Sequence, residues 1–407
     1  MGRPTAQDAR GHVLIIVQNL PVPLDRRVWL ECQALVAAGR RVTVICPKGP
    51  GDPSRQSIDG VDIRKYRPAP ATSGLLSYLW EFVYSWVRTA RLAREVWRTA
   101  PFDVIQACNP PDTYWALARR YQRRGVRFVY DQHDLNPEVF RSRFGEPSGL
   151  MARLQYRTLC WLERRTYRTA DHVISTNGSY RQIAMSRGGK RADEVTVVRS
   201  GPDTTAMSRI EADPALRRGR AHLAVYLGIM GPQDGVDLAL RALDHLVHKL
   251  GHRDLQLALL GFGDSYDDLV ALAHELRLDE YVTFTGRADA AMIAAYLSAA
   301  DLGLQPDPLN PLNDVSTMNK TMEYMSYELP VVCFDLAETR VSAGDTAVYV
   351  EPNDVAKFAA AIAELLEDPE RRRELGRAAR ARAVAELDWR PQRAAYVGVY
   401  DRLLDRD

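Results

Sequence analysis

The sequence lacks the features that mark several classes of protein. Its five cysteines are scattered and no Cys-x-x-Cys occurs, which argues against structural zinc and for a reducing compartment. No apolar run reaches the roughly 18 residues needed to span a bilayer, and the polar start does not resemble a signal peptide. Basic and acidic residues nearly balance, at 54 against 52, so no global charge points to nucleic acid. We therefore expect a cytoplasmic protein.

The order of elements predicts two α/β domains, for which 407 residues are long enough. Short apolar runs suited to buried strands alternate with helical segments, a pattern typical of parallel sheets covered on both faces. The first series of predicted strands lies at 12–18, 41–47, 61–67, 102–108, 127–131 and 172–176. A second series lies at 222–227, 255–260, 281–285, 301–304, 330–334 and 347–350. The segment 201–221 is the predicted linker.

Helices are predicted between these strands. Asp25 can cap a helix that runs to about Ala38 and stops at Gly39, and further helices are predicted at about 111–124 and 150–169. A charged helix, 368–387, precedes a last helix that is rich in aromatic residues.

The stretch Asn313–Asp335 carries the clearest functional signal. A polar loop runs into a helix containing Glu323, which breaks at Leu329-Pro330 before a short apolar strand. Free N–H groups and the dipole make a helix N-terminus favourable for phosphate. A carboxylate one turn further in is suited to accept from ribose hydroxyls. Taken alone, Glu323 could equally be a solvated surface residue.

This stretch resembles the donor-binding block of retaining glycosyltransferases of family four. That family often has Glu-x7-Glu here, but Val315 occupies the position of the first glutamate, one residue after Asp314. The run from Ser316 to Lys320 resembles a variant with Ser-x-x-Asn-Lys ahead of the second glutamate. The resemblance implies an α/β protein with the GT-B fold, in which two Rossmann-like domains face a central cleft.

The implied domains are an acceptor-binding domain over residues 12–205 and a nucleotide-sugar donor-binding domain over 206–388. In GT-B enzymes the end of the chain commonly crosses back to the N-terminal domain, so 389–407 is predicted to do the same. An amphipathic helix packing on its own domain is the alternative.

Further local matches occur in the expected order. The segment 131–138 resembles the family's Asp-x-His-Asp/Glu element, and 198–203 resembles its hinge element. The glycine loop at 228–235 has Met230 and Asp234 where many members carry Arg and Lys. The loop after the first strand lacks the glycine pair that the family usually has there. The elements 260–264 and 285–287 resemble the turns that face the nucleoside.

Site residues follow from these matches, position by position. Catalysis is assigned to His133 and Lys320. The donor diphosphate is assigned to Gly231, Arg199, Lys320 and Asn319. The donor nucleoside is assigned to Glu323, Gly261, Gly263 and Arg287. The sugar or acceptor is assigned to Asn19, Arg26, Asp134, Glu138, Ser316 and Thr317. Arg26 could also simply decorate the first turn of a helix, as could Arg27.

The implied activity is transfer of a hexose or amino-hexose, with retention, from a nucleotide diphosphate sugar such as a UDP-sugar to an acceptor hydroxyl. The acceptor would be a glycan, a lipid-linked saccharide or a natural product. The resemblance implies no bound cofactor and no metal. Two alternatives stay open, a GT-B sugar-nucleotide epimerase and a catalytically silent sugar-nucleotide-binding protein.

The segment 75–98 suggests a further partner. It is rich in Trp and Tyr, and at 100° per residue its four arginines fall within about 120° of the helix. The arginines are Arg88, Arg91, Arg94 and Arg98. Aromatic residues beside a basic face suit the anionic inner face of a membrane. A crossover helix with a solvated arginine face explains the pattern equally simply.

Overall fold

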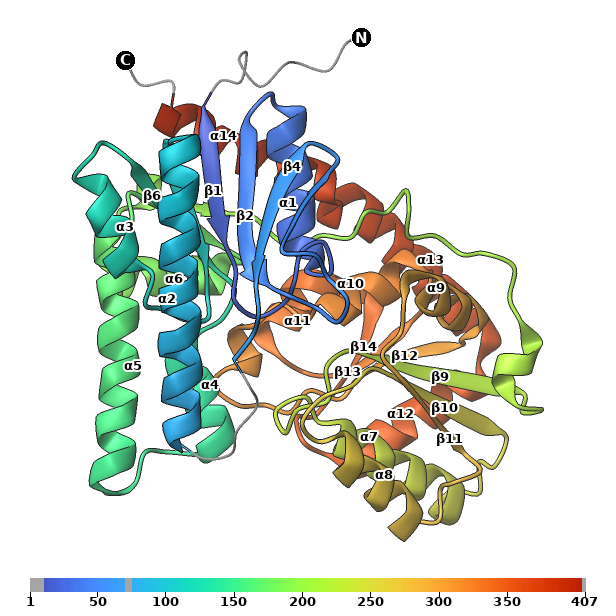
Figure 1. Cartoon of the computed structure of the whole chain (residues 1–407). Coiled ribbons are helices and arrows are strands. Elements are labelled where there is room, and N and C mark those ends of the chain that lie inside the picture. Colours follow the sequence, from blue (N-terminus) through green and yellow to red (C-terminus); the bar gives the residue numbers. More distant parts are fainter. Residues whose placement is uncertain (1–10, 70–74, 405–407) are drawn as a thin grey trace. The chain divides into compact units, whose positions relative to one another are not determined.

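The computed structural model describes residues 11–69 and 75–404, with the backbone alone over 75–79. The chain divides into two compact units (Figure 1). Unit 1 comprises Met1–Phe140, Glu146–Ser200 and Pro391–Asp407, and unit 2 comprises Arg141–Gly145 and Gly201–Arg390.

Unit 1 is built on an eight-stranded sheet with the order β3-β4-β2-β1-β5-β6-β7-β8. All neighbouring strands are parallel except β3, which is antiparallel to β4. The strands are β1 (His12–Ile16), β2 (Arg41–Pro47), β3 (Arg55–Ile58), β4 (Val61–Tyr66), β5 (Val104–Cys108), β6 (Arg127–Gln132), β7 (His172–Ser175) and β8 (Val195–Val197). The helices are α1 (Arg26–Ala37), α2 (Leu75–Thr99), α3 (Trp115–Gln122), α4 (Asn136–Phe144), α5 (Gly149–Thr169), α6 (Gly178–Ser186) and α14 (Trp389–Leu404).

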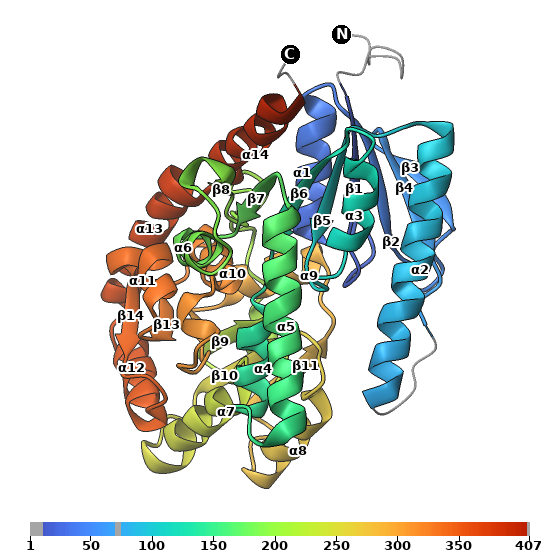
Figure 2. The ribbon, with the colours of Figure 1, turned by 90° about the vertical axis from the view of Figure 1, so that its left-hand side faces the viewer.

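The central strand β5 shows how the two faces of this sheet differ. Ile105 and Ala107 join a core that includes residues of α2, α3 and α5. Side chains alternate along a strand, so Gln106 points to the opposite face, where it meets α1 and α14. Figure 2 shows α2, α3 and α5 together on one side of the sheet.

Unit 2 is built on a six-stranded parallel sheet with the order β11-β10-β9-β12-β13-β14. The strands are β9 (His222–Leu227), β10 (Leu255–Leu260), β11 (Val282–Gly286), β12 (Leu302–Gln305), β13 (Val331–Phe334) and β14 (Ala347–Val350). The helices are α7 (Val236–Asp244), α8 (Tyr266–Glu275), α9 (Ala290–Ala299), α10 (Asn319–Ser326), α11 (Ala337–Ala343), α12 (Val355–Glu367) and α13 (Pro369–Arg382). Helices α7, α8 and α12 pack on one face, and α9, α10 and α13 on the other.

The predicted α/β class and both series of strands are confirmed. Asp25 caps α1 by accepting a hydrogen bond from the N–H of Val28 at 3.1 Å. Strands β3 and β8 were not predicted, because β3 is a polar edge strand and β8 has only three residues. Part of the predicted linker packs on unit 2, where Arg217 forms an ion pair with Asp301 at 2.7 Å.

Candidate functional site

The predicted donor residues of unit 2 gather where parallel strands end, the edge at which open α/β sheets bind ligands. Helix α10 is fastened there by Tyr324, whose hydroxyl accepts from the N–H of Leu227 at 2.8 Å and donates to the carbonyl of Leu304 at 3.1 Å. These two residues belong to the ends of β9 and β12. The first turn of α10 therefore lies at the carboxyl ends of both strands.

Lys320 is buried in that first turn. Its ammonium donates to both carboxylate oxygens of Asp307, at 2.7 and 2.9 Å, and lies 5.0 Å from the centre of the Tyr226 ring. Burial raises the pKa of Asp307, although Lys320 opposes the rise. The cation is thus held in place by a carboxylate that the sequence did not single out.

Asp234 adds a second carboxylate to this site. It accepts from the N–H of Gly231 at 2.9 Å, and burial raises its pKa to about 6 despite Lys320. The Gly231 N–H is therefore occupied by a carboxylate of the same loop. Lys320 therefore acts electrostatically on two carboxylates, those of Asp307 and Asp234.

The glycines predicted to face the nucleoside are required by close backbone contacts. A Cβ on Gly261 would lie 1.8 Å from the carbonyl oxygen of Gly228, and one on Gly263 would lie 2.5 Å from that of Met230. The N–H of Met230 donates to the carbonyl of Phe262 at 2.9 Å, so the two loops are joined. Arg287 stacks on the Phe262 ring at 4.1 Å.

The polar residues before α10 are part of an ordered loop. Ser316 donates to the carbonyl of Leu312 at 2.7 Å, and Asp314 accepts from the N–H of Ala337 at 2.9 Å. Thr317 is half-buried and Asn319 is exposed. Glu323 is half-buried one turn into the helix, as predicted.

In unit 1, His133 belongs to a buried cluster of charges at the carboxyl end of β6. Its Nε2 lies 2.7 Å from Asp131 Oδ2, and Arg27 donates to Asp131 Oδ1 at 2.9 Å. Glu31, one helical turn after Arg27, lies 3.1 Å from the Arg27 Nε. The backbone N–H of His133 donates to Asn109 at 2.6 Å, which fixes the loop.

Burial and charge act in opposite directions on these groups. Burial lowers the pKa of His133, but Asp131 outweighs burial and the pKa is raised. Burial and Asp131 raise the pKa of Glu31 to about 8. Asp131 is held ionised, because Arg27 and His133 outweigh its burial and lower its pKa.

Models of two protein families match the chain. Glycosyl transferases group 1 matches residues 221–368, and the glycosyl transferase 4-like domain matches residues 24–201. A glycogen synthase of Mycobacterium tuberculosis is 29% identical over 93% of this chain and 90% of its own length. A GDP-mannose-dependent phosphatidylinositol monomannoside mannosyltransferase of Mycolicibacterium smegmatis is 30% identical over 80% of this chain and 94% of its own length.

The chain belongs to the GT4 glycosyltransferase family. It is an enzyme of the glycosyltransferase class, as predicted.

Solved structures agree on the fold of this glycosyltransferase. A sucrose-phosphate synthase from Thermosynechococcus elongatus superposes with a TM-score of 0.77 at 20% identity, covering 97% of this chain and 99% of that one. Anabaena HepE in complex with UDP-glucose superposes with a TM-score of 0.68 at 17% identity, covering 96% and 100%. The predicted GT-B fold is confirmed.

Three more residues of unit 1 were predicted to face the sugar or acceptor, namely Glu138, Asn19 and Arg26. Both carboxylate oxygens of Glu138 accept from Arg187, at 2.6 and 3.0 Å, and Arg187 also donates to the buried Glu163. Glu138 thus forms an ion pair within unit 1, and its role toward a sugar or acceptor stays a prediction. Asn19 and Arg26 are exposed.

Asp134 and Arg199 are two further predicted residues of unit 1. Asp134 is half-buried, and its backbone N–H donates to Asn109 at 3.1 Å. The backbone N–H of Arg199 donates to Gln392 at 2.9 Å.

Several residues of the cluster were missed. Arg27, rather than its neighbour Arg26, turns inward, and Glu31 and Gln106 are buried beside it. The spacing of Arg27 and Glu31 by four residues on one helix was the available signal. Gln106 and the tyrosines that bind it gave no local signal, because they lie about 290 residues apart.

A metal ion does not suit this cluster. Among the described residues, ligand atoms of Cys108, Asp131 and His133 lie within 4.8 Å of one another. However, Asp131 already accepts from Arg27, His133 and Gln106. Burial and Asp131 also raise the pKa of the Cys108 thiol. A metal ion here would lie beside the positively charged Arg27 guanidinium, which would repel it. The arrangement of Cys108, Asp131 and His133 is therefore better explained by hydrogen bonding.

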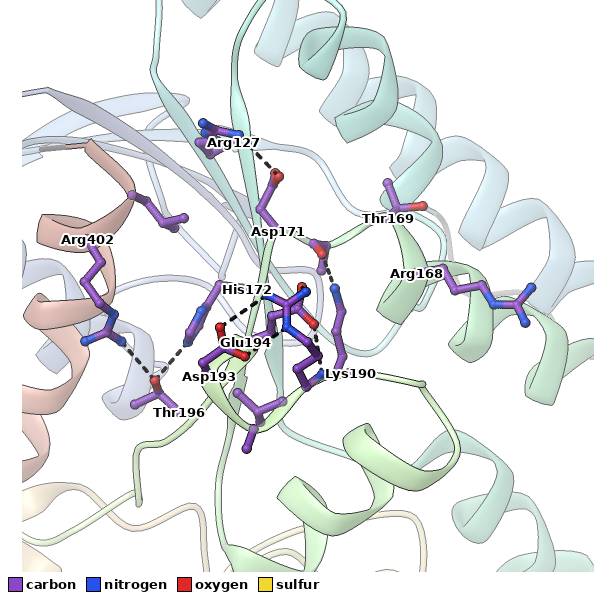
Figure 3. Close-up of a pocket in the computed structure, with 15 residues that line it drawn as sticks. Arg127, Arg168, Thr169, Asp171, His172, Lys190, Asp193, Glu194, Thr196 and Arg402 are labelled. Atoms are coloured by element: carbon purple, nitrogen blue, oxygen red, sulfur yellow. Dashed lines mark hydrogen bonds and ion pairs between the residues drawn. The ribbon is translucent and has the colours of Figure 1, made fainter. Parts of the chain in front are cut away.

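A separate cavity of about 670 Å³ opens at the other end of the sheet (Figure 3). It lies at the amino ends of β6, β7 and β8, where Arg127, His172 and Val195 begin the strands. In Figure 3 His172 and Arg402 both point to Thr196. None of the predicted site residues lines this cavity.

Proposed function

We propose that the enzyme transfers a hexose or amino-hexose from a nucleotide diphosphate sugar to an acceptor hydroxyl with retention of configuration. The observation that carries this proposal is the buried Lys320 in the first turn of α10, with Glu323 one turn later. A fixed cation at a helix N-terminus suits a departing diphosphate, which electrostatic preorganisation would stabilise. The leaving phosphate would help to accept the acceptor's proton.

The donor and acceptor are proposed by class. One relative is named for GDP-mannose and one structural neighbour was solved with UDP-glucose, which supports a nucleotide sugar but leaves the base open. The named products of the relatives, glycogen and a mannosylated phosphatidylinositol, support a saccharide or lipid-linked acceptor. An epimerase would need free carboxylates beside the sugar, whereas Asp131 and Glu138 are both bound by arginines.

A substitution of Glu323 tests whether this residue binds the ribose of the donor. We expect Glu323→Ala to weaken binding of the nucleoside diphosphate at least ~30-fold, about 2 kcal/mol, because a charge-assisted hydrogen bond to the ribose is lost. Isothermal titration calorimetry measures this loss. Glu364→Ala removes an exposed helical carboxylate of the same unit and should leave the affinity unchanged. Equal affinities in wild type and Glu323→Ala would refute the ribose assignment.

We also propose that unit 1 contacts an anionic membrane surface through α2 and α5. Trp80, Val83 and Val87 are exposed between the start and the middle of α2, and at 100° per residue they share a face with Arg91 and Arg94. Ser85, Thr89, Ala93 and Val96 form the buried face.

Helix α5 also has exposed apolar residues followed by arginines on one face. Leu150 and Leu154 are exposed near its start, and Arg157, Arg165 and Arg168 follow on the same face. Both helices begin at the same end of unit 1 (Figures 1 and 2). On both helices, exposed apolar side chains are followed along the chain by arginines. This arrangement suits a lipid surface with anionic headgroups. No helix in the described part of the chain is long and apolar enough to cross a bilayer.

The binding of lipid vesicles tests whether α2 and α5 contact an anionic membrane. We expect Arg91→Gln/Arg94→Gln to weaken binding to phosphatidylglycerol-containing vesicles about 30-fold, since each arginine near such a surface contributes about 1 kcal/mol. Arg373→Gln/Arg377→Gln on α13 removes two exposed arginines of unit 2 and is the matched control. Co-sedimentation at low salt is the measurement. Equal losses in the two variants, or no binding by the wild type, would contradict the proposal.

A further inference from the structure

The glycine loop of unit 2 lies between the first turn of α10 and the segment after β12. At one end of the loop, a Cβ on Gly228 would lie 3.3 Å from the Cε of Lys320. At the other end, a Cβ on Gly235 would lie 2.1 Å from the carbonyl oxygen of Pro306, the residue before Asp307. The loop therefore passes directly beside the ion pair of Lys320 and Asp307.

Asp234 is the acidic residue of this loop, and hydrogen bonds hold its side chain in place. Its Oδ2 accepts from the N–H of Gly231 at 2.9 Å and from the side-chain amide of Gln233 at 3.2 Å. The backbone carbonyl of Gln233 accepts in turn from the side chain of Asn313 at 2.8 Å. The carboxylate is thus a fixed part of the loop that passes beside Lys320.

The Asp234 carboxylate interacts with the other charges of the site. Lys320 on α10 and Arg143 on α4 attract it, and the Asp307 carboxylate after β12 repels it. Tyr226 on β9, whose ring lies beside the Lys320 ammonium, is a further titratable group that interacts with it. Asp307 is paired directly with Lys320, whereas in the described part of the chain no ion pair involves Asp234. An anion held by Lys320 therefore meets the negative charge of Asp234.

The donor and the product of the proposed reaction differ in charge. Transfer breaks the bond between the anomeric carbon and the terminal phosphate oxygen, and the electron pair stays on that oxygen. Above the second pKa of a phosphate, about 6, the proton from the acceptor hydroxyl passes on to water. The nucleoside diphosphate then carries about one negative charge more than the nucleotide sugar. A fixed carboxylate therefore repels the product more strongly than the donor.

We propose that Asp234 is a specificity-determining residue, whose carboxylate disfavours the nucleoside diphosphate relative to the nucleotide sugar and so promotes release of the product. This inference rests on the proposed function, because it takes the diphosphate to be held by Lys320. An asparagine at this position keeps an oxygen that accepts from the N–H of Gly231 and removes the charge. Asp234→Asn therefore changes the charge of the loop without removing its hydrogen bond.

The test is a calorimetric titration of the wild type and Asp234→Asn with UDP and with UDP-glucose at low salt. GDP and GDP-mannose replace them if the protein binds guanosine nucleotides instead. At about pH 8 we expect the variant to bind UDP about 30-fold tighter and UDP-glucose about tenfold tighter than the wild type, since the carboxylate repels each charge of the ligand. Asp244→Asn removes a half-buried carboxylate at the other end of α7 and should change neither affinity.

The effect should disappear in acid. Burial raises the pKa of Asp234 to about 6, so its carboxyl group is ionised above that pH and neutral well below it. The terminal phosphate of UDP also takes up a proton near pH 6. At about pH 5 we therefore expect wild type and Asp234→Asn to agree within about twofold for both ligands.

The outcomes separate this inference from the proposed function. Equal gains for UDP and UDP-glucose would overturn the role of Asp234, and so would equal gains in Asp244→Asn or gains that persist in acid. If Asp234→Asn does not fold, Asp234→Ser gives the same comparison, because a hydroxyl also accepts from the N–H of Gly231. A folded wild type that binds no nucleotide would overturn the proposed function and this inference together, whereas binding without a selective gain overturns the inference alone.

Discussion

Lys320→Met will destabilise unit 2 by about 3–5 kcal/mol, because it leaves Asp307 buried without its cation. The carboxylate of Asp307 has no other hydrogen-bonded cation among the described residues. Burial already raises the pKa of Asp307, so in the variant this group takes up a proton as the pH falls. The loss of stability, measured by urea unfolding, should therefore be larger at pH 8 than at pH 6.

A double variant separates stability from binding. Lys320→Met/Asp307→Asn removes both charges of the Lys320–Asp307 pair, and we expect most of the stability to return. Binding of the nucleoside diphosphate should stay at least ~100-fold weaker than in the wild type, about 3 kcal/mol, while binding of the nucleoside changes little. If diphosphate and nucleoside lose affinity equally, the lysine has a structural role and another group holds the phosphates.

His133→Ala should reduce kcat by about 100-fold or more, a range typical of a positioned proton donor or acceptor. Asp131 keeps its bonds to Arg27 and Gln106, so the cost in stability should be only about 1 kcal/mol. A comparison of initial rates and of Tm in the same buffer measures both effects.

His172→Ala is the matched control for this prediction. His172 is a buried histidine of unit 1 that bonds Thr196 at 2.8 Å, and it begins β7 at the opposite edge of the sheet. We expect its loss to lower Tm while kcat stays within about twofold, roughly 0.4 kcal/mol. The same small effect on kcat in His133→Ala would show that His133 is structural.

Features governed by neighbouring residues could be predicted from the sequence. The Asp25 cap depends on a donor three residues away, and the buried strands depend on their own apolar runs. Glu323 follows the loop at the spacing that a helix imposes. These local patterns, in order along the chain, were enough to predict two parallel sheets and the helix at the strand ends.

Features that depend on residues far away in the sequence could not be predicted from it. Nothing near Lys320 reveals that Asp307 occupies its ammonium, and nothing near Glu138 reveals Arg187. Gly261 and Gly263 match a ligand-binding pattern, yet the contact that forbids a side chain comes from the 228–231 loop. In each case the partner is set by the packing of strands and loops, which local sequence does not encode.

The anomeric configuration of the product tests the central claim most directly. The purified enzyme would be incubated with a panel of nucleotide diphosphate sugars and candidate saccharide or lipid-linked acceptors, and the donor that is consumed identified. Proton NMR of the new glycosidic bond, recorded early in the reaction, then gives its configuration. We predict release of a nucleoside diphosphate and a bond with the same anomeric configuration as the donor. An inverted bond, or an epimerised sugar nucleotide without transfer, would contradict the account.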